Sequence, residues 1–417
     1  MSIDTRVTDS AVYHILPTAH KGYITGSCLV TAGALYADYE DRLLTEMLTE
    51  SLSMGTKSKT EAVFNEELES SGIRISLMPI YGYIVVKFTC LKQDFAKAAR
   101  LINEQLVEPR LDKEDVESLK ERYRAQLKAA KHSTSYQANA VFTQQIYPEK
   151  HFFRLELPTK SLLNLVEETT NKRLRDFHQS FDLMHQVKWV VVGDVPPDEV
   201  VSELEQYAQK TGAMPNIKRA QLDALPLKSV VKRVTVKDKQ SVDVRIGHSL
   251  PINQHHPDYL PLKLAIDALG GSFSARLMRT VRDEDGLTYN VGSMLSNFYH
   301  EQEGYWCIYG SFSPKLLNQG IASIERQLKL WLSKGITQEE LEERKKGMIG
   351  KYQVMLSDPS VLAGRIVSNI ENGFEEAHLY TYPEKVEQVT LEQVNAAIQK
   401  YIQGEKLVHV YAGSIDS

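Results

Sequence analysis

The sequence predicts an α+β fold of two tandem homologous domains, each a mostly antiparallel sheet covered by helices. The same series of predicted elements occurs once in each half of the 417-residue chain. Strands follow one another as in hairpins, and helices also come in succession, which favours α+β over alternating βαβ units. We therefore predict an N-terminal repeat over residues 1–215, a C-terminal repeat over 229–417, and a linker over 216–228 that is rich in Pro, Ala and Lys.

Two helices begin the shared series in each repeat. The first opens at Asp38-Tyr39 in one repeat and at Asp258-Tyr259 in the other, and apolar residues then recur at three- and four-residue spacing. That spacing is typical of a helix with one buried face. A second helix is predicted over 60–71 and over 274–282, and each is followed by a glycine, as helix C-termini often are.

Strands and two more helices complete each repeat. The first repeat has predicted strands at 73–77 and 83–89, where apolar and polar residues alternate with the period of two that a sheet requires. The second has strands at 287–295 and 305–311. Amphipathic helices at 93–107 and 315–332 lead into charged helices capped by Asp112 and Thr337. A short β-rich run closes each repeat at 189–193 and 409–413, and a helix at 197–211 precedes the linker.

The composition is typical of a water-soluble globular protein, and the net charge does not indicate a nucleic-acid or membrane partner. Hydrophobic residues make up 42% and charged residues 25%, and the formal net charge is −5. This charge gives no basic surface for nucleic acid or an anionic membrane, so we expect neither partner. Three scattered cysteines, an odd number, indicate a reducing compartment and buried thiols rather than a disulfide framework.

The N-terminal residues 1–6 lack the apolar core of a signal peptide, and no apolar run approaches the roughly 20 residues of a membrane helix. We expect a cytoplasmic location. A chain from which a signal peptide has been removed would look the same, so a periplasmic location stays open.

The first helix of the N-terminal repeat carries Glu46, Thr49 and Glu50, and Gly55-Thr56 follows it. This segment resembles the zinc-binding helix of the pitrilysin/insulinase family of metallopeptidases, in which His-x-x-Glu-His precedes Gly-Thr. The resemblance implies that Glu46 and Glu50 stand where the family has its two histidine ligands and that Thr49 replaces the catalytic glutamate. The third ligand of the family is a glutamate on a later helix, and Gln126 is the aligned position here, to within about a residue.

Two further segments carry the resemblance over nearly the whole chain. One is the closing strand at 191–194, and the other is the stretch 270–293, which begins Gly-Gly-Ser-Phe. In the family this second stretch carries an arginine and a tyrosine that hold the bound peptide, at the positions of Arg282 and Tyr289. Some members are heterodimers, like the mitochondrial processing peptidase, whose fold the resemblance implies. There one subunit keeps the zinc and the other keeps the Arg/Tyr pair.

The residues at the zinc positions cannot supply zinc chemistry. Two histidines four residues apart can hold one zinc ion on a helix face, with the adjacent glutamate as the base for the metal-bound water. Here both imidazoles, the base and the third carboxylate are all replaced. Glu46 and Glu50 share a helix face and could be considered for a hard metal such as calcium, but no further oxygen ligands are visible, so two solvated glutamates are the plainer interpretation. We predict no metal in this chain.

Arg282 and Tyr289 retain the groups that bind peptides. A guanidinium can donate two hydrogen bonds to a carbonyl or carboxylate, and a phenol can donate to the carbonyl oxygen that gains negative charge. Without the resemblance, a helix-end charge and a strand aromatic would explain both residues. Strand 73–77 is the candidate sheet edge for an added substrate strand, but Ile75-Ser76 replaces the Asn-Ala usual in the family, so we do not assign it as a site.

These observations predict a non-catalytic, substrate-binding subunit of a heterodimeric zinc endopeptidase that acts on unfolded peptides. The zinc is expected in a homologous partner subunit, and this chain would supply Arg282 and Tyr289 to that partner's active site. Three alternatives remain open: a structural or scaffold subunit, a homodimeric peptide-binding pseudoenzyme, and a self-sufficient peptidase with an atypical metal at Glu46 and Glu50.

Overall fold

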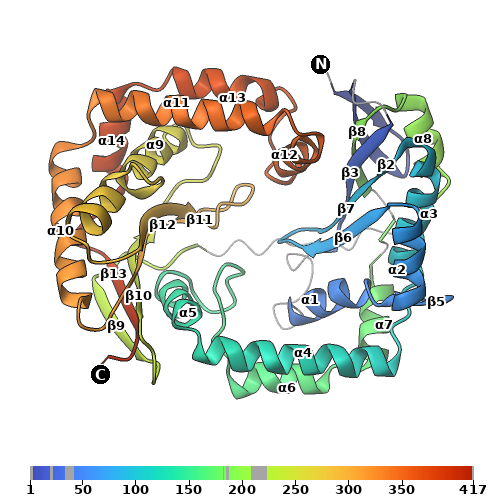
Figure 1. The fold of residues 1–417 in the computed structure, drawn as a ribbon, viewed down its shortest axis with the longest axis horizontal. Coiled ribbons are helices and arrows are strands. Elements are labelled where there is room, and N and C mark those ends of the chain that lie inside the picture. The colour runs from blue at the N-terminus through green and yellow to red at the C-terminus, as the bar shows by residue number, and fades with distance from the viewer. Residues whose placement is uncertain are drawn as a thin grey trace. The chain divides into compact units, whose positions relative to one another are not determined.

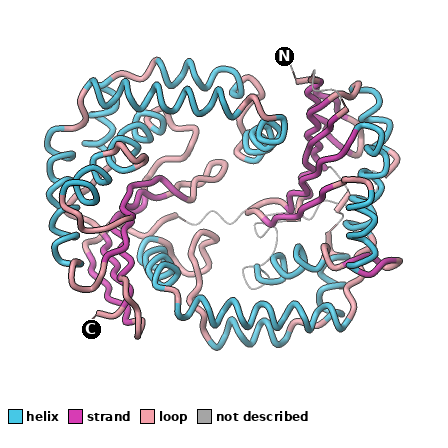
Figure 2. The backbone as a smooth tube through the Cα atoms, viewed as in Figure 1, coloured by secondary structure: helices cyan, strands magenta, loops and turns pink. Residues whose placement is uncertain are grey.

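A computed structural model describes residues 3–18, 22–32, 42–181, 183–184, 187–207 and 223–415 of the chain (Figures 1 and 2). It forms two compact units that interleave along the sequence. Unit 1 comprises Met1–Gln126, Lys160–Ala220 and Gln353–Leu379, and unit 2 comprises Leu127–Thr159, Gln221–Tyr352 and Tyr380–Ser417. Each unit therefore contains a segment from the other half of the chain.

Unit 1 is built on a six-stranded sheet in the order β1-β2-β8-β3-β7-β6. All neighbours are antiparallel except β2 and β8, which run parallel. The strands are β1 (Asp4–Val7), β2 (Ala11–Pro17), β3 (Tyr23–Val30), β6 (Arg74–Pro79), β7 (Ile84–Leu91) and β8 (Val187–Gly193). The predicted strands of the first repeat are thus confirmed, and β6 lies at the sheet edge.

Helices cover both faces of this sheet. The helices that contact its strands from the first half are α1 (Arg42–Ser51), α2 (Glu61–Ser70), α3 (Phe95–Val107) and α8 (Pro197–Glu205). Phe95 of α3 packs against Phe88 of β7, with ring centroids 6.2 Å apart. Val85 of β7 points to the opposite face, because side chains alternate along a strand, and there it packs under α12 (Pro359–Glu371).

The second half of the chain thus supplies one layer of unit 1. Helix α12 contacts β3 and β8, and its apolar residues join the strands in one buried cluster: Leu16, Leu29, Tyr83, Val85, Val190, Val192, Leu362, Ala363, Ile366, Val367 and Leu379. The other elements of unit 1 are the short hairpin β4 (Gly55–Thr56) and β5 (Lys59–Thr60), helices α6 (Lys160–Glu168) and α7 (Asn171–Gln179), and most of α4 (Lys113–His132).

Unit 2 repeats the plan with a five-stranded sheet in the order β11-β12-β10-β13-β9. Only β13 and β9 are parallel. The strands are β9 (Val230–Thr235), β10 (Val242–Ser249), β11 (Asn290–Ser296), β12 (Tyr305–Phe312) and β13 (Val408–Gly413). Helix α5 (Thr134–Ile146), from the first half, packs on β10 and β13. The remaining helices are α9 (Tyr259–Gly270), α10 (Leu317–Lys334), α11 (Gln338–Met355), α13 (His378–Glu387) and α14 (Leu391–Tyr401).

The prediction of an α+β fold with mostly antiparallel sheets covered by helices is confirmed. The cap at Thr337 is confirmed as well: its hydroxyl accepts from the backbone N–H of Glu340 at 3.2 Å, while the Glu340 carboxylate accepts from the Thr337 N–H at 2.8 Å. All three cysteines are free and buried. The repeat boundaries stay a prediction. The compact units do not coincide with the two repeats, because α5 of the first half belongs to unit 2 and α12 of the second half belongs to unit 1.

Several expected segments differ or lie outside the described residues. The predicted helix 274–282 is a π-helix over Met278–Glu284, in which Asp285 N–H donates to the Thr280 carbonyl at 2.8 Å. The strand predicted from 287 begins only at Asn290, because the backbone N–H of Leu287 donates to the Val281 carbonyl. Residues 38–39 of the first helix, the end of the 197–211 helix and residues 216–222 of the linker lie outside the described part.

Glu371 at the end of α12 should make stability depend on pH. Burial against the sheet raises the pKa of its carboxyl to about 7, an effect that Lys87 opposes. In the unfolded state the carboxyl loses its proton near the ordinary pKa of 4.5, whereas in the native state it keeps the proton up to about pH 7. The native state is therefore most stable at low pH, and its free energy of unfolding falls as pH rises from 4.5 to about 7. We expect the free energy of unfolding to fall by about 1–3 kcal/mol across that window. Urea titrations of the protein and of Glu371→Gln check this. The variant should lack this fall, and an equal fall in both proteins would contradict the assignment.

Candidate functional site

Helix α1 places the three degenerate zinc positions in unit 1, and each is engaged differently. The Thr49 side chain is buried, and its hydroxyl donates to the backbone carbonyl of Thr45 at 2.8 Å. Glu46 reaches solvent, yet the surrounding protein raises the pKa of its carboxyl, with Arg42 acting against this rise and Glu50 adding to it. At the position of the family's base, the structure therefore has a hydroxyl that is bound to its own helix.

Helix α4 meets Glu50 with residues that the sequence did not single out. Tyr123 is buried there, and burial together with the nearby carboxylates of Glu46 and Glu50 raises the pKa of its phenol. Arg122 Nη1 lies 3.8 Å from Glu50 Oε2. Gln126, the predicted third-ligand position, is exposed one turn further along α4. Tyr123 lies three residues before Gln126, and residues three apart lie on the same side of a helix. The sequence could therefore have indicated Tyr123 as a neighbour of the zinc positions.

The chemistry of these donors does not fit a catalytic zinc. Zinc sites take imidazole, thiolate or carboxylate ligands in a closed tetrahedral shell. Of the zinc positions on α1, Glu46 and Glu50 are of that kind, and Glu50 already lies near the Arg122 guanidinium and the Tyr123 phenol. Within the ranges that the structure describes, no three His, Cys, Asp or Glu side chains are grouped for a metal. No catalytic step through a metal on this chain follows from these residues.

Arg282 and Tyr289 lie on the two sides of one anchored turn in unit 2. Arg282 belongs to the π-helix, and Tyr289 directly precedes β11. Between them Asp285 accepts hydrogen bonds from Ser323 at 2.5 Å and from Arg326 at 2.8 Å, both on α10. These bonds hold the turn against the body of the unit, so the two predicted peptide-binding residues are presented from a fixed support.

The side chains of this turn are available to a ligand. The Tyr289 side chain is 93% exposed. The Arg282 guanidinium lies 5.5 Å from the ring centroid of Phe273, which is itself 77% exposed. In the described part of the chain, no hydrogen bond or ion pair joins Arg282 to Tyr289. Phe273 is the residue that sequence reasoning missed here, and only its place in the same Gly-Gly-Ser-Phe stretch pointed to it.

The predicted edge strand is confirmed in unit 1. Strand β6 pairs with β7 on one side only, as the last strand of its sheet. Ile75 and Ser76 lie in its middle. Its outer edge therefore presents backbone donors and acceptors of the kind to which an extended peptide can add. Separately, no helix in the described ranges has the length and apolar character needed to cross a membrane.

Comparison with known families identifies both halves of the chain. Residues 22–151 match the family described as insulinase (peptidase family M16), and residues 169–348 match the peptidase M16 inactive domain. Among curated proteins, the "Non-peptidase homolog YmxG" of Helicobacter pylori is 24% identical over 344 residues, which cover 81% of this chain and 75% of that protein. The "Probable inactive metalloprotease YmfF" of Bacillus subtilis is 24% identical over 183 residues, or 43% of this chain and 41% of that protein.

Solved structures agree on the fold. A peptidase M16 inactive domain from Pseudomonas fluorescens superposes with a TM-score of 0.86 at 19% identity, covering 100% of this chain and 99% of that one. A protease from Helicobacter pylori gives 0.85 at 15% identity, with 98% of each chain covered. The periplasmic protease PqqL from Escherichia coli gives 0.81 at 15% identity, with 99% of this chain but 47% of that one covered. The chain thus belongs to the insulinase family, M16.

Proposed function

We propose that this chain is the non-catalytic, substrate-binding subunit of a heterodimeric zinc endopeptidase that acts on unfolded peptides. Its partner is a homologous subunit that keeps His-x-x-Glu-His and the zinc, and we place the complex in the cytoplasm. The observation that carries the proposal is a contrast within one molecule. The zinc positions have no imidazole, while half-buried Arg282 and exposed Tyr289 lie on an anchored turn.

The exposed pair has the chemistry of a substrate clamp. The Tyr289 hydroxyl can donate to the carbonyl oxygen that gains negative charge when water attacks the peptide bond. The Arg282 guanidinium can donate two hydrogen bonds to a neighbouring carbonyl or carboxylate of the peptide. The Phe273 ring, 5.5 Å from the guanidinium, stabilises its charge through a cation–π contact. A ligand or partner that excludes water from this Tyr/Arg pair would strengthen these bonds, because charges interact more strongly at a lower effective dielectric constant.

The names of the relatives support a division of labour. One relative in Helicobacter pylori is called a non-peptidase homolog, whereas the Bacillus subtilis YmxG, 38% identical over 90 residues, is called an uncharacterized zinc protease. That second match covers 22% of each chain, so it supports common descent and no more. Proteins named as zinc proteases and as non-peptidase homologues therefore both occur among the relatives of this chain.

The proposal is tested by reconstituting the pair. The chain is co-expressed with a homologous chain from the same genome that keeps His-x-x-Glu-His, and cleavage of a quenched fluorescent peptide is measured for each chain alone and for both together. We expect stable co-purification and chelator-sensitive activity only in the mixture. A partner that is fully active without this chain would contradict the proposal. Chelator-sensitive turnover by this chain alone would favour the self-sufficient peptidase instead.

A further inference from the structure

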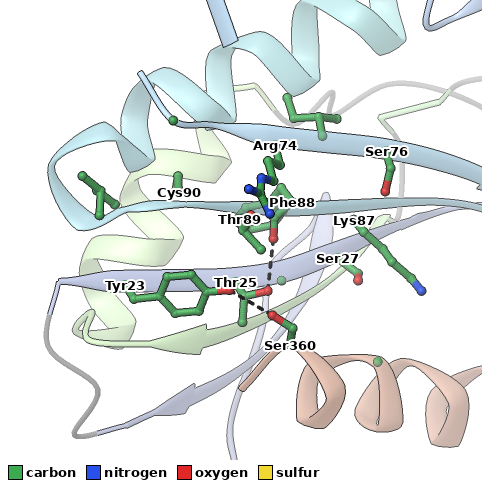
Figure 3. Close-up of a pocket in the computed structure, with 15 residues that line it drawn as sticks. Tyr23, Thr25, Ser27, Arg74, Ser76, Lys87, Phe88, Thr89, Cys90 and Ser360 are labelled. Carbon is green, nitrogen blue, oxygen red and sulfur yellow. Dashed lines mark hydrogen bonds between the residues drawn. The ribbon is translucent and has the colours of Figure 1, made fainter. Parts of the chain in front are cut away.

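Unit 1 contains a cavity of about 630 Å³ on the α12 side of its sheet, between β3, β7, the edge strand β6 and the start of α12. We call it the β6–β7 cavity. Figure 3 shows its labelled side chains on these three strands, with Ser360 approaching from α12. The Tyr23 hydroxyl is hydrogen-bonded to Ser360 Oγ at 2.9 Å and ties the strand to the helix at one end of the cavity. All of its lining residues belong to unit 1.

The sheet register explains which polar side chains line this cavity. Arg74, Thr89 and Thr25 lie side by side in one row across β6, β7 and β3. The next row contains Ser76, Lys87 and Ser27, and the following row turns apolar with Met78, Val85 and Leu29. Leu29 and Val85 belong to the cluster covered by α12. The two polar rows therefore lie beside this apolar cluster, near the first residues of α12.

The two cations of these rows, Arg74 and Lys87, form no ion pair with a carboxylate among the described residues. Arg74 and Lys87 are diagonal neighbours on one face, a placement that sets their Cβ atoms about 7 Å apart. Neither forms an ion pair or a side-chain hydrogen bond among the described residues, and both are exposed. The groups nearest to Lys87 include the Glu371 carboxyl of α12, whose pKa of about 7 leaves it only partly charged at neutral pH. The cavity thus carries a positive charge that its own residues do not balance.

We infer that the β6–β7 cavity holds an acidic side chain of an extended peptide bound along β6, so that the substrates of this subunit are peptides with acidic residues. The inference rests on the proposed function. A carboxylate between Arg74 and Lys87 would relieve their repulsion and accept charge-assisted hydrogen bonds. The hydroxyls of Ser27, Ser76 and Thr89 supply further donors around it.

The neighbouring edge favours a peptide over a small free anion. Residues 74–76 of β6 both line the cavity and form the open edge of the sheet. A peptide added to that edge places every second side chain on the cavity face, because the side-chain period of a strand is two. A volume of about 630 Å³ is also within the range of ligand sites that hold more than a single small ion.

Binding to the purified chain tests this inference without a partner subunit. Isothermal titration compares two acetylated, amidated octapeptides in which Val alternates with Glu or with Gln. We expect the Glu peptide to bind about tenfold more tightly, and the preference to shrink at about 1 M salt. Arg74→Met and Lys87→Met should each remove most of the preference, because each weakens binding of the Glu peptide more than binding of the Gln peptide. Glu371→Gln removes the competing carboxyl and should strengthen binding of the Glu peptide.

Gly364 of α12 offers a matched pair of variants that leave the charges intact. It lines the cavity, and a Cβ built there meets no atom within 4 Å. Gly364→Leu should fill the space and abolish the Glu preference, whereas Gly364→Ala should keep it and preserve the helix. Thermal unfolding of each variant confirms that the fold is retained.

Three outcomes would overturn the inference. Equal binding of the Glu and Gln peptides would remove the acidic specificity and leave the proposed function standing, since Arg282 and Tyr289 lie outside the cavity. Free glutamate that binds as tightly as the Glu peptide would assign the cavity to a small carboxylate. Peptide binding that survives Gly364→Leu with its preference unchanged would place the acidic site elsewhere.

Discussion

Replacing Tyr289 by Phe in the reconstituted complex is expected to lower kcat about 10²-fold while leaving KM nearly unchanged. The substitution keeps the ring and removes only the hydroxyl of a side chain that is 93% exposed, so it cannot disturb a core. A loss confined to kcat is expected because the hydroxyl stabilises charge that exists only in the transition state. Steady-state cleavage of the quenched peptide by wild-type and variant complexes measures both constants.

Arg282→Ala should act differently and so serve as a companion test. Its guanidinium holds the substrate before and during the reaction, so we expect a higher KM together with a lower kcat. Tyr380→Phe is a matched control, because it removes the same atom from another partly exposed tyrosine, 47% accessible on α13. Unchanged kinetics in both Tyr289→Phe and Arg282→Ala complexes would favour the scaffold alternative.

Expression of residues 1–215 alone is expected to give an aggregated or molten protein, although the sequence duplication suggests a complete domain. Without α12, the buried cluster on that face of the sheet loses its cover, and Leu29, Val85, Val190 and Val192 become exposed. Each large apolar side chain contributes about 1.5–3 kcal/mol on burial. The loss of burial of several such side chains is as large as the free energy of unfolding of a typical domain, about 5–15 kcal/mol. Helix α5 would also lose its sheet, β10 and β13.

Supplying the missing helix should rescue the fragment. Fusion of residues 353–379 after residue 215 through a flexible linker is expected to restore solubility and a cooperative urea transition. The same fusion with Leu362, Ile366 and Val367 changed to Ser is the control and should fail, because it keeps the length and removes the apolar face of α12. A cooperative transition for residues 1–215 without the helix would show that the exchange is dispensable.

The sequence was sufficient to predict elements whose signals are local. The four-residue spacing of apolar residues predicted α1 and α3, and alternation predicted β7, because helix and strand periods act within a few residues. Some boundaries were wrong where tertiary hydrogen bonds decide them. The π-helix over Met278–Glu284 and the late start of β11 both depend on bonds around the anchored turn at Asp285.

The loss of the zinc ligands was also readable from the sequence alone, since ligand chemistry is a property of residue type. Glu46, Thr49 and Glu50 cannot become imidazoles in any fold. Only the tertiary structure decided what replaces the metal, because the contact of Tyr123 with Glu50 joins two separate helices. The tertiary structure likewise decided that α5 packs in unit 2 and α12 in unit 1. It also decided the strand register that sets Arg74 diagonal to Lys87. Packing and strand register pair residues far apart in the chain, and no local pattern records those partners.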